Sequence, residues 1–230
     1  GFACDGAFYD WTAGQVVVNN SNGQHVTNLK GFRLTIDKVG GGSCLVGYNR
    51  PPLVPAVWTV TNGTLQIGTA TRSADLYVGY RQDWTTNGGY GKLVVSNAVF
   101  DANLGVCYVA WVGEGGGSAE LDLTSARLAN GLFKANDLQV GKTAAYGCPG
   151  YLKIGPNSAL TNLMVVNTLR IGGGGGALGR LGDPNDNYRL PTNVNVTLGS
   201  WGATRCNVTL AEHTYAWVGP ADGKLVASAG

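Results

Sequence analysis

The sequence has little charge, and it lacks the patterns that several common functions require. Charged residues make up 13% of the 230 residues, against roughly 25% in typical soluble domains. The net charge is +2, and Lys and Arg stand singly along the chain, so the basic surface of a nucleic-acid-binding protein is not expected. No apolar run approaches the roughly 18 residues that a membrane-spanning helix needs. We therefore expect no nucleic-acid partner and no membrane span.

Motifs for catalysis and cofactor binding are also missing. The two histidines, His25 and His213, stand in no pattern typical of a metal site or a triad. There is no G-x-S-x-G motif, and the glycine run 172–176 is not followed by the Lys-Ser/Thr of a phosphate-binding loop. Asp183 and Asp186 are candidates for a Ca²⁺ site, with a plain turn as the alternative. We predict that the protein is not an enzyme and uses no cofactor.

The five cysteines bear on the compartment in which the protein works. They form no C-x-x-C pair, so a zinc ribbon or thioredoxin-type site is not expected. In an oxidising compartment they form two disulfides and leave one thiol, whereas in a reducing cell all five are buried thiols. Low charge, and a chain that begins with Gly1 and shows no leader, favour an extracellular or cell-surface location. The disulfide candidates are Cys4, Cys44, Cys107, Cys148 and Cys206.

Glycine, in contrast, is abundant, with 37 residues, and it marks an internal repeat. Each unit opens with a small residue, commonly followed by Leu-x-(Val/Ile/Leu), and closes with an apolar residue and Gly. Three units of equal length align without gaps, and shorter or less regular ones flank them. The units begin at Gly31, Gly63, Gly91, Ala119, Gly150, Gly176 and Ser200, and a fragment runs from Gly223 to Gly230.

Apolar residues alternate within the units, which is the signature of strands with one buried face. Intervals of 28 and 31 residues separate Gly91, Ala119 and Gly150, and they fit one coil of a parallel β-helix. We predict an all-β, single-domain, right-handed parallel β-solenoid of about seven rungs over 31–222, with a partial rung over 1–30 and a half rung over 223–230. The closing glycines are expected to need a positive φ.

The alternation also predicts which side chains form the core. The residues expected to face inward are Leu65, Ile67, Leu76, Val78, Leu93, Val95, Leu121, Leu123, Leu138, Val140, Leu152, Ile154, Leu169 and Ile171. The Gly-x-Leu-x-Val units resemble the repeats of autotransporter passenger domains and related surface proteins with parallel β-helices, over residues 31–230. The resemblance implies a surface location and a role in adhesion or assembly, and it implies no catalytic residue.

Outward residues of successive rungs form columns, and one column is a candidate binding surface. The column consists of the residue two positions before each closing glycine. Leu45 and Thr197 also belong to it. Aromatic rings beside amide and guanidinium groups suit a surface glycan, whereas cover by loops or a neighbouring subunit is the alternative. The candidate binding residues are Tyr77, Trp111, Gln139, Arg170 and Trp217.

A second column combines charges with an aromatic ring. Lys92, Glu120 and Tyr151 follow one another, and Asp122 lies beside Lys153. Carboxylates next to lysines resemble the acid and base groups of a polysaccharide lyase or hydrolase. Opposite charges on neighbouring strands also relieve repulsion in a parallel stack. We favour the second interpretation, because the acids are not concentrated in one place.

The two ends of the array each contain part of a unit. The last eight residues match only the opening of a unit, and the first fourteen match only its close. We therefore expect copies to assemble head to tail into a filament, with the unpaired cysteine linking neighbours. A stand-alone adhesin or glycan-binding solenoid is the alternative, and a polysaccharide lyase or hydrolase is the third. The expected interface residues are Phe2, Phe8, Tyr9, Trp11, Leu225 and Val226.

Overall fold

The fold is known from a computed structural model, which describes residues 9–19, 24–38, 43–47, 55–80, 90–112, 118–143, 149–172, 179–190, 194–198, 206–210, 213–217 and 224–225. The strands are β1 (Trp11–Ala13), β2 (Val16–Val18), β3 (Gln24–Asn28), β4 (Arg33–Ile36), β5 (Cys44–Val46), β6 (Ala56–Thr61), β7 (Thr64–Ile67), β8 (Ala74–Tyr80), β9 (Gly91–Val112), β10 (Ala119–Leu128), β11 (Leu132–Thr143), β12 (Gly150–Lys153), β13 (Asn162–Ile171), β14 (Gly179–Gly182), β15 (Asn195–Leu198), β16 (Cys206–Leu210), β17 (His213–Trp217) and β18 (Lys224–Leu225). Short 3-10 turns are η1 (Ala129–Gly131), η2 (Pro156–Ser158) and η4 (Pro184–Asp186). Within these ranges, no helix is long and apolar enough to cross a membrane.

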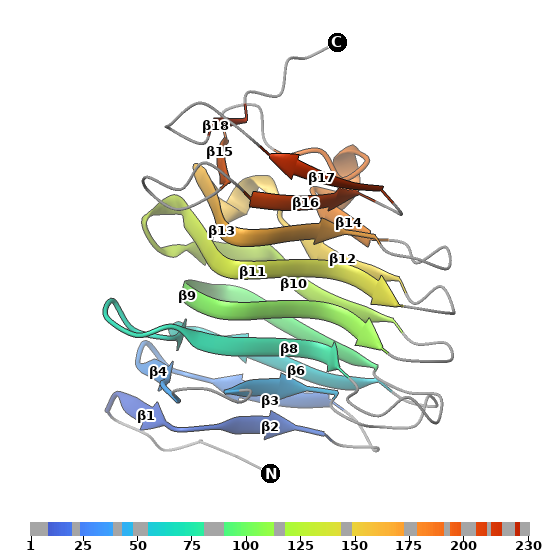
Figure 1. Ribbon diagram of the computed structural model, residues 1–230. Coiled ribbons are helices and arrows are strands. Elements are labelled where there is room, and N and C mark those ends of the chain that lie inside the picture. Colours follow the sequence, from blue (N-terminus) through green and yellow to red (C-terminus); the bar gives the residue numbers. More distant parts are fainter. Residues whose placement is uncertain are drawn as a thin grey trace.

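Two parallel sheets run the length of the molecule (Figure 1). Sheet A stacks β3, β6, the first part of β9, β10, β12 and β14. Sheet B stacks β2, β5, β8, the last part of β9, β11 and β13. A shorter third side consists of β1, β4, β7 and the middle of β9. The all-β parallel solenoid that the sequence predicts is therefore confirmed.

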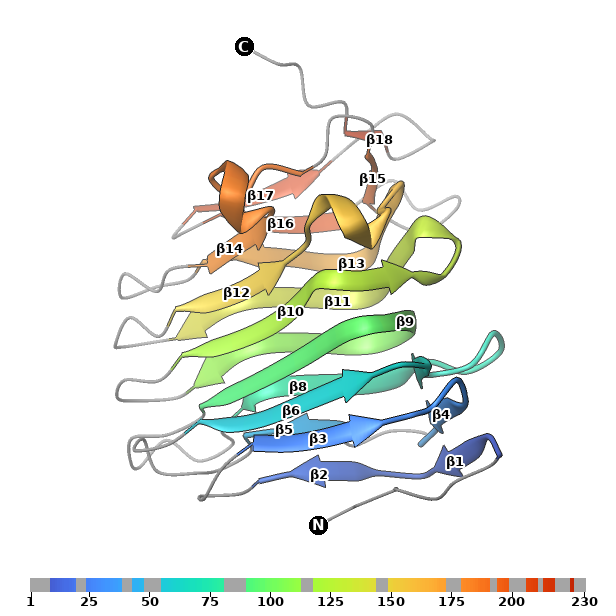
Figure 2. The ribbon, with the colours of Figure 1, turned by 180° about the vertical axis from the view of Figure 1, so that it is seen from behind.

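The direction of the strands gives the hand of the coil. With the N-terminal turns at the bottom, sheet B runs from left to right in front (Figure 1). Seen from behind, sheet A also runs from left to right (Figure 2). The chain therefore circles counter-clockwise as it rises towards a viewer at the top, and the coil is right-handed, as predicted.

The regular part of the solenoid has about four turns, fewer than the seven rungs expected. Turns 55–80, 90–112, 118–143 and 149–172 are described over most of their length. Above them, β15 and β16 pair with the two halves of β13, so together they form one layer. β17 and β18 then run antiparallel to β16 and β15. The last two units of the sequence thus form a single layer with an antiparallel cover, because the chain reverses direction there.

The core fills the space between the sheets, and the predicted inward residues form it. All of them are buried except Ile171, which is partly buried and packs against the core. Phe100 and Phe133 stack at the centre, with ring centroids 6.3 Å apart. One inward column of sheet A places His25, Trp58 and Leu93 on successive strands, and it continues upward as leucines. Only the lowest strand of this column carries a polar side chain inward.

Glycines close several of the described turns at one corner, whereas Ala110, with φ 60°, takes the equivalent position in the turn 90–112. The closing glycines among the described residues have positive φ, as predicted, a conformation that costs other residues a steric penalty. Gly113, Gly199 and Gly219 lie outside the described residues. Gly179, and not the predicted Gly176, lies in register with the opening Gly150. An added Cβ at Gly179 lies 2.1 Å from the nitrogen of Gly172 and 2.2 Å from the oxygen of Val140. Gly172 at the end of one turn therefore contacts Gly179 of the next without space for a side chain. The equivalent positions two turns lower carry the small side chains of Ala110 and Ala119. The φ angles are 71° at Gly47, 61° at Gly79, 72° at Gly141 and 76° at Gly172.

Candidate functional site

The charged column on sheet A is an ion-pair ladder. Oε2 of Glu120 lies 2.9 Å from Nζ of Lys92 and 2.9 Å from Nζ of Lys153. Partial burial alone raises the pKa of Glu120, but hydrogen bonds from the two lysines outweigh it and hold the pKa below its usual value. A carboxylate kept ionised between two cations differs from a general acid, whose pKa is raised. The geometry therefore supports the structural interpretation of this column.

The candidate binding column on sheet B differs in register from the prediction. Tyr77 pairs with Tyr108, Tyr108 pairs with Gln139, and Gln139 pairs with Arg170. Trp111, predicted to follow Tyr77, instead lies beside Tyr80 in the register. The structure thus brings together three of the predicted residues and replaces Trp111 by Tyr108.

The register differs because the two turns have different numbers of residues between the third side and sheet B. From Phe100 to Leu104 the strand β9 continues without an inserted turn, whereas the equivalent path from Leu128 to Ala135 includes η1, with 3 residues. Aligning units of equal length therefore displaces the end of β9 relative to β11. Trp217 is also outside the column, because β17 runs antiparallel to β16.

The two tyrosines of this column, Tyr77 and Tyr108, stack on each other, and the neighbouring Tyr80 stacks on both. Ring centroids of Tyr77 and Tyr80 are 4.5 Å apart with an interplanar angle of 18°, and those of Tyr77 and Tyr108 are 5.4 Å apart at 20°. Burial, and the charge of Asp75, raise the pKa of the Tyr77 hydroxyl. Ring faces that contact each other are not available to a sugar. Gln139 is only 9% exposed, so the column resembles a packed ladder more than an open binding face.

The candidate calcium segment is a capped turn. Oδ1 of Asp183 accepts a hydrogen bond from the backbone N–H of Asn185 at 2.9 Å, and Asp183 forms an antiparallel bridge with Arg189. The backbone N–H of Asp186 donates to the oxygen of Asp183 at 3.1 Å. In the described part of the chain, no group of three or more His, Cys, Asp or Glu side chains is placed to hold a metal. The plain turn is the better interpretation.

Two of the predicted disulfide cysteines are free thiols. Cys44 and Cys107 are buried in the core of sheet B, and Leu76 lies between them in register. Burial raises the pKa of both thiols. The structure supports no disulfide at either residue, and two strand spacings exclude a bridge between the two. Cys206 lies in β16, and Cys4 and Cys148 lie outside the described residues.

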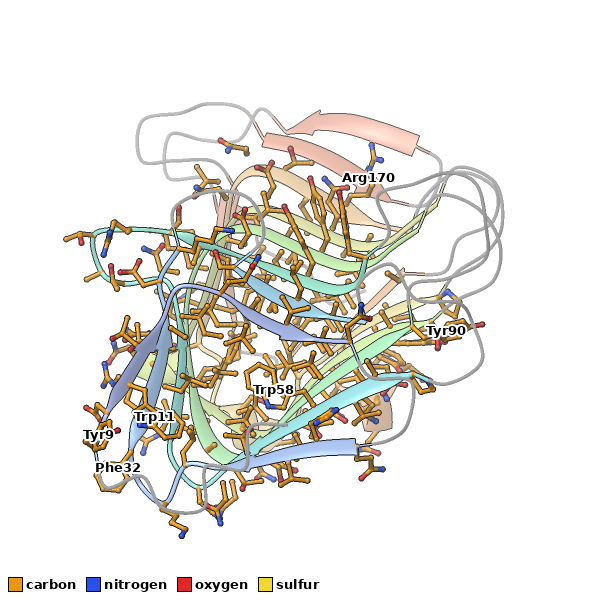
Figure 3. The ribbon with its side chains drawn as sticks, turned by 90° about the horizontal axis from the view of Figure 1, so that it is seen from below. Tyr9, Trp11, Phe32, Trp58, Tyr90 and Arg170 are labelled. Atoms are coloured by element: carbon orange, nitrogen blue, oxygen red, sulfur yellow. The ribbon has the colours of Figure 1, made fainter. Side chains whose placement is uncertain are left out.

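The N-terminal end of the solenoid is open as far as the described residues show. β1 and β2 form two sides of the first turn, but among the described strands none pairs with the lower edge of β3. A cavity of about 830 Å³ opens here, lined by Trp11, Val16, Val18 and Trp58 among others. Figure 3 looks into this end, with Trp58 inside and Trp11 nearer the rim. Among the described residues, no strand covers this end of the hydrophobic core.

Exposed apolar side chains gather at the same end. Within the described ranges, the large hydrophobic residues that are exposed are Tyr9 at 68%, Val17 at 49% and Val26 at 58%. All three belong to the first two turns: Val17 is the outward residue of β2, and Val26 is the apolar one of the outward residues of β3. A concentration of exposed apolar groups beside an open cavity is typical of an interaction surface.

The lower edge of β3 also presents backbone hydrogen-bonding groups. The N–H of Leu29 donates to the oxygen of Thr61 at 2.8 Å, so residue 29 faces β6. Because successive residues of a strand face opposite sides, the N–H groups of Gln24, Val26 and Asn28 point away from β6. Their side chains lie on the outer face of sheet A. β3 is therefore an edge strand ready to pair.

The predicted assembly residues divide between the two ends. Tyr9 and Trp11 lie at the open N-terminal end, as expected. Leu225, expected to open a free half rung, pairs instead with Val196 of β15 in antiparallel orientation. Phe2, Phe8 and Val226 lie outside the described residues. Sequence reasoning missed β3 itself, although the alternation in Gln24–Asn28 was a usable signal.

Comparison with known proteins finds no match for this chain. No protein-family model, no curated protein and no solved structure matches the chain. The parallel β-helix that the resemblance to autotransporter passenger domains implied is present, but no match connects the chain with that family. Function therefore has to be inferred from the site alone.

Proposed function

We propose that this protein is a structural β-solenoid of the cell surface or extracellular space, which associates with a second copy of itself through its open N-terminal end. The observation that carries the proposal is the lower edge of β3, unpaired among the described strands and lying beside a cavity of about 830 Å³. Natural proteins usually cover such edges, because unpaired N–H and C=O groups recruit other chains.

The apolar surface at this end supports the same conclusion. Tyr9, Val17 and Val26 are exposed, and Trp11, Val16 and Val18 are only partly buried against the core. Covering apolar surface stabilises a complex by about 25 cal/mol per Å². A strand added below β3 extends sheet A by one layer and covers the cavity. This is β-augmentation, in which the backbone supplies the hydrogen bonds and side chains supply the specificity.

The edge can be blocked by one substitution without loss of an internal hydrogen bond. Val26→Pro removes an N–H that points away from β6 and places a ring where a pairing strand must approach. Val26→Thr keeps the N–H and the β-branched shape, and it serves as the matched control. Circular dichroism and thermal unfolding check that both variants are folded.

Sedimentation velocity over a concentration series then tests the proposal. We expect the wild type and Val26→Thr to form larger species as the concentration rises, and Val26→Pro to stay monomeric. A wild type that remains monomeric at every concentration overturns the proposal. Equal association of the folded Val26→Pro variant shows that β3 is not the contact, and it overturns the proposal as well.

A further inference from the structure

We infer that the strand that pairs with β3 is the segment 223–228 of a second copy, donated from its C-terminal end into the first turn of the solenoid. This contact rests on the proposed function and specifies which part of the partner fills the edge. It gives the head-to-tail assembly that the sequence predicts a strand, a direction and a register.

The place below β3 is a slot one strand wide. β1 pairs with the lower edge of β4, and β2 pairs with the lower edge of β5, so the first turn has a third side and a strand of sheet B. Among the described strands, none supplies its strand of sheet A. The folded edge of a second copy is too broad for this slot, because β1 and β2 occupy the rest of the layer. A single extended segment fits and completes the turn.

The strands of sheet A share a pattern that the slot continues downward. From β9 upward, each strand opens with a small residue and carries an inward leucine two positions later, in register throughout. The segment 223–228, GKLVAS, has the same pattern and differs at one position from GKLVVS at 91–96 in β9. The segment 1–8, GFACDGAF, does not contain the pattern. The segment 223–228 therefore has the sequence of the kind of strand that the first turn lacks.

The register of this strand follows from the match with β9. Leu93 pairs with Trp58, and Trp58 pairs with His25. In the same register one layer lower, Leu225 lies below His25 and points inward. It then enters the cavity that His25 and Trp58 line, and it adds a leucine to the bottom of a column that continues as leucines at the top.

The outer face and the backbone of β3 fit the same register. Val226 lies below Val26, so the apolar side chain that is 58% exposed in the single copy gains an apolar neighbour. Gln24, Val26 and Asn28 direct their N–H and C=O groups into the slot. A parallel strand there forms about six hydrogen bonds with these three residues.

Donation of this strand breaks only a short pairing. In the single copy, β18 pairs antiparallel with β15 over two residue pairs, whereas β3 offers five residues, Gln24–Asn28. Residues 218–223 separate β17 from β18, a length of chain that can span about 20 Å. The C-terminal end can therefore release the strand and reach a neighbouring copy.

The slot and the donated strand lie at opposite ends of the molecule, with β3 near the bottom and β18 at the top of Figure 1. A contact between unlike ends is heterologous, so each copy receives one strand and donates another. Assembly therefore continues beyond two copies.

Mixed cysteine variants test this register. Val26→Cys is mixed with Val226→Cys, so a 26–226 disulfide forms only between copies. Residues in register on neighbouring strands lie about 4.8 Å apart, within the range that a disulfide spans. Val26→Cys mixed with Ala227→Cys is the matched control, because residue 227 faces inward in the proposed register. After mild oxidation, cross-linked peptides are mapped by mass spectrometry, and circular dichroism checks that the variants are folded.

We expect the 26–226 link at about tenfold the yield of any 26–227 link or more. Light scattering of the wild type should give masses that rise beyond twice the monomer mass. Association that Val26→Pro abolishes, without a 26–226 link above the control, overturns the donated strand but leaves the proposed function standing. A wild type that stays monomeric at every concentration overturns both.

Discussion

The indole N–H of Trp58 donates a hydrogen bond to Oγ1 of Thr27 at 2.9 Å, deep in the open end of the solenoid. Both residues are buried, Trp58 at 3% and Thr27 at 6% exposure. β3 contributes the acceptor and β6 the donor, so the bond ties the edge strand to the strand above it. It also holds the Trp58 ring at the wall of the cavity.

Thr27→Val removes the acceptor and keeps the shape of the side chain. The buried N–H of Trp58 is then left without its partner, and we expect the free energy of unfolding to fall by about 1–3 kcal/mol. Thr12→Val, at an exposed outward position of β1, is the control and should change it by less than about 0.5 kcal/mol. Urea denaturation followed by tryptophan fluorescence measures both. Equal effects of the two substitutions contradict the prediction.

The glycine contact at the corner predicts a large effect of one methyl group. In Gly179→Ala the new Cβ overlaps the main chain of Val140 and Gly172, so we expect a loss of about 2–4 kcal/mol in the free energy of unfolding. In Gly14→Ala the new Cβ meets nothing within 4 Å, and little change is expected. Thermal and urea unfolding compare the two variants. A stable Gly179→Ala shows that the corner is not packed as described.

The ion-pair ladder predicts a stability that falls in acid. The pKa of Glu120 is lowered in the folded protein, so its contribution is present above the ordinary value of about 4.3 and is lost as the pH falls through the folded value. For side chains that are partly exposed, about 1 kcal/mol is the expected size. Glu120→Gln should lose this amount at pH 7 and little at pH 3. Urea denaturation at both pH values gives the difference, and an equal loss at both contradicts the ladder.

The tyrosine stack predicts coupling between Tyr77 and Tyr108. Stacked aromatic pairs are stabilised by about 0.5–1.5 kcal/mol beyond area burial, so a double-mutant cycle with both residues changed to Leu should give a coupling energy of this size. Tyr151 lies on sheet A, away from the stack, and the cycle of Tyr77 with Tyr151 should give none. If the cycle of Tyr77 with Tyr108 also gives no coupling energy, the result contradicts the register that replaces Trp111 by Tyr108.

The buried thiols predict slow chemical labelling. Cys44 and Cys107 have no exposed surface, and burial raises the pKa of both thiols, so little reactive thiolate is present at pH 8. We expect iodoacetamide to modify them in the unfolded protein and to leave them unmodified in the native protein over the same time. Peptide mapping reads out each cysteine separately. Rapid native labelling, or a disulfide at either residue, contradicts the assignment.

The fold class was predictable because both signals for it are local. Alternating residues such as Leu93 and Val95 are buried as their pattern indicates, and closing glycines such as Gly79 have the positive φ that a tight corner needs. The number of rungs was not predictable, because antiparallel pairing of β17 leaves no mark in a pattern of period two. The same limit applies to β18.

The candidate site was harder to predict than the fold. The position of Trp111 depended on an alignment of equal lengths, and η1 breaks that equality. Tyr9 and Trp11 were predicted at an interface because their segment lacks the opening of a unit, and this stays a prediction. Val26 was missed because an exposed apolar residue has meaning only when its neighbours in space are known. The open edge is a property of the stack and of no single unit.

Hydrogen exchange across a concentration series tests the open N-terminal end most directly. The amides of Gln24, Val26 and Asn28 face the edge, so association through β3 should slow their exchange as the concentration rises. A change in the exchange of β18 at the other end over the same series is the further result that head-to-tail assembly predicts. Exchange in 24–28 that is the same at every concentration contradicts the account.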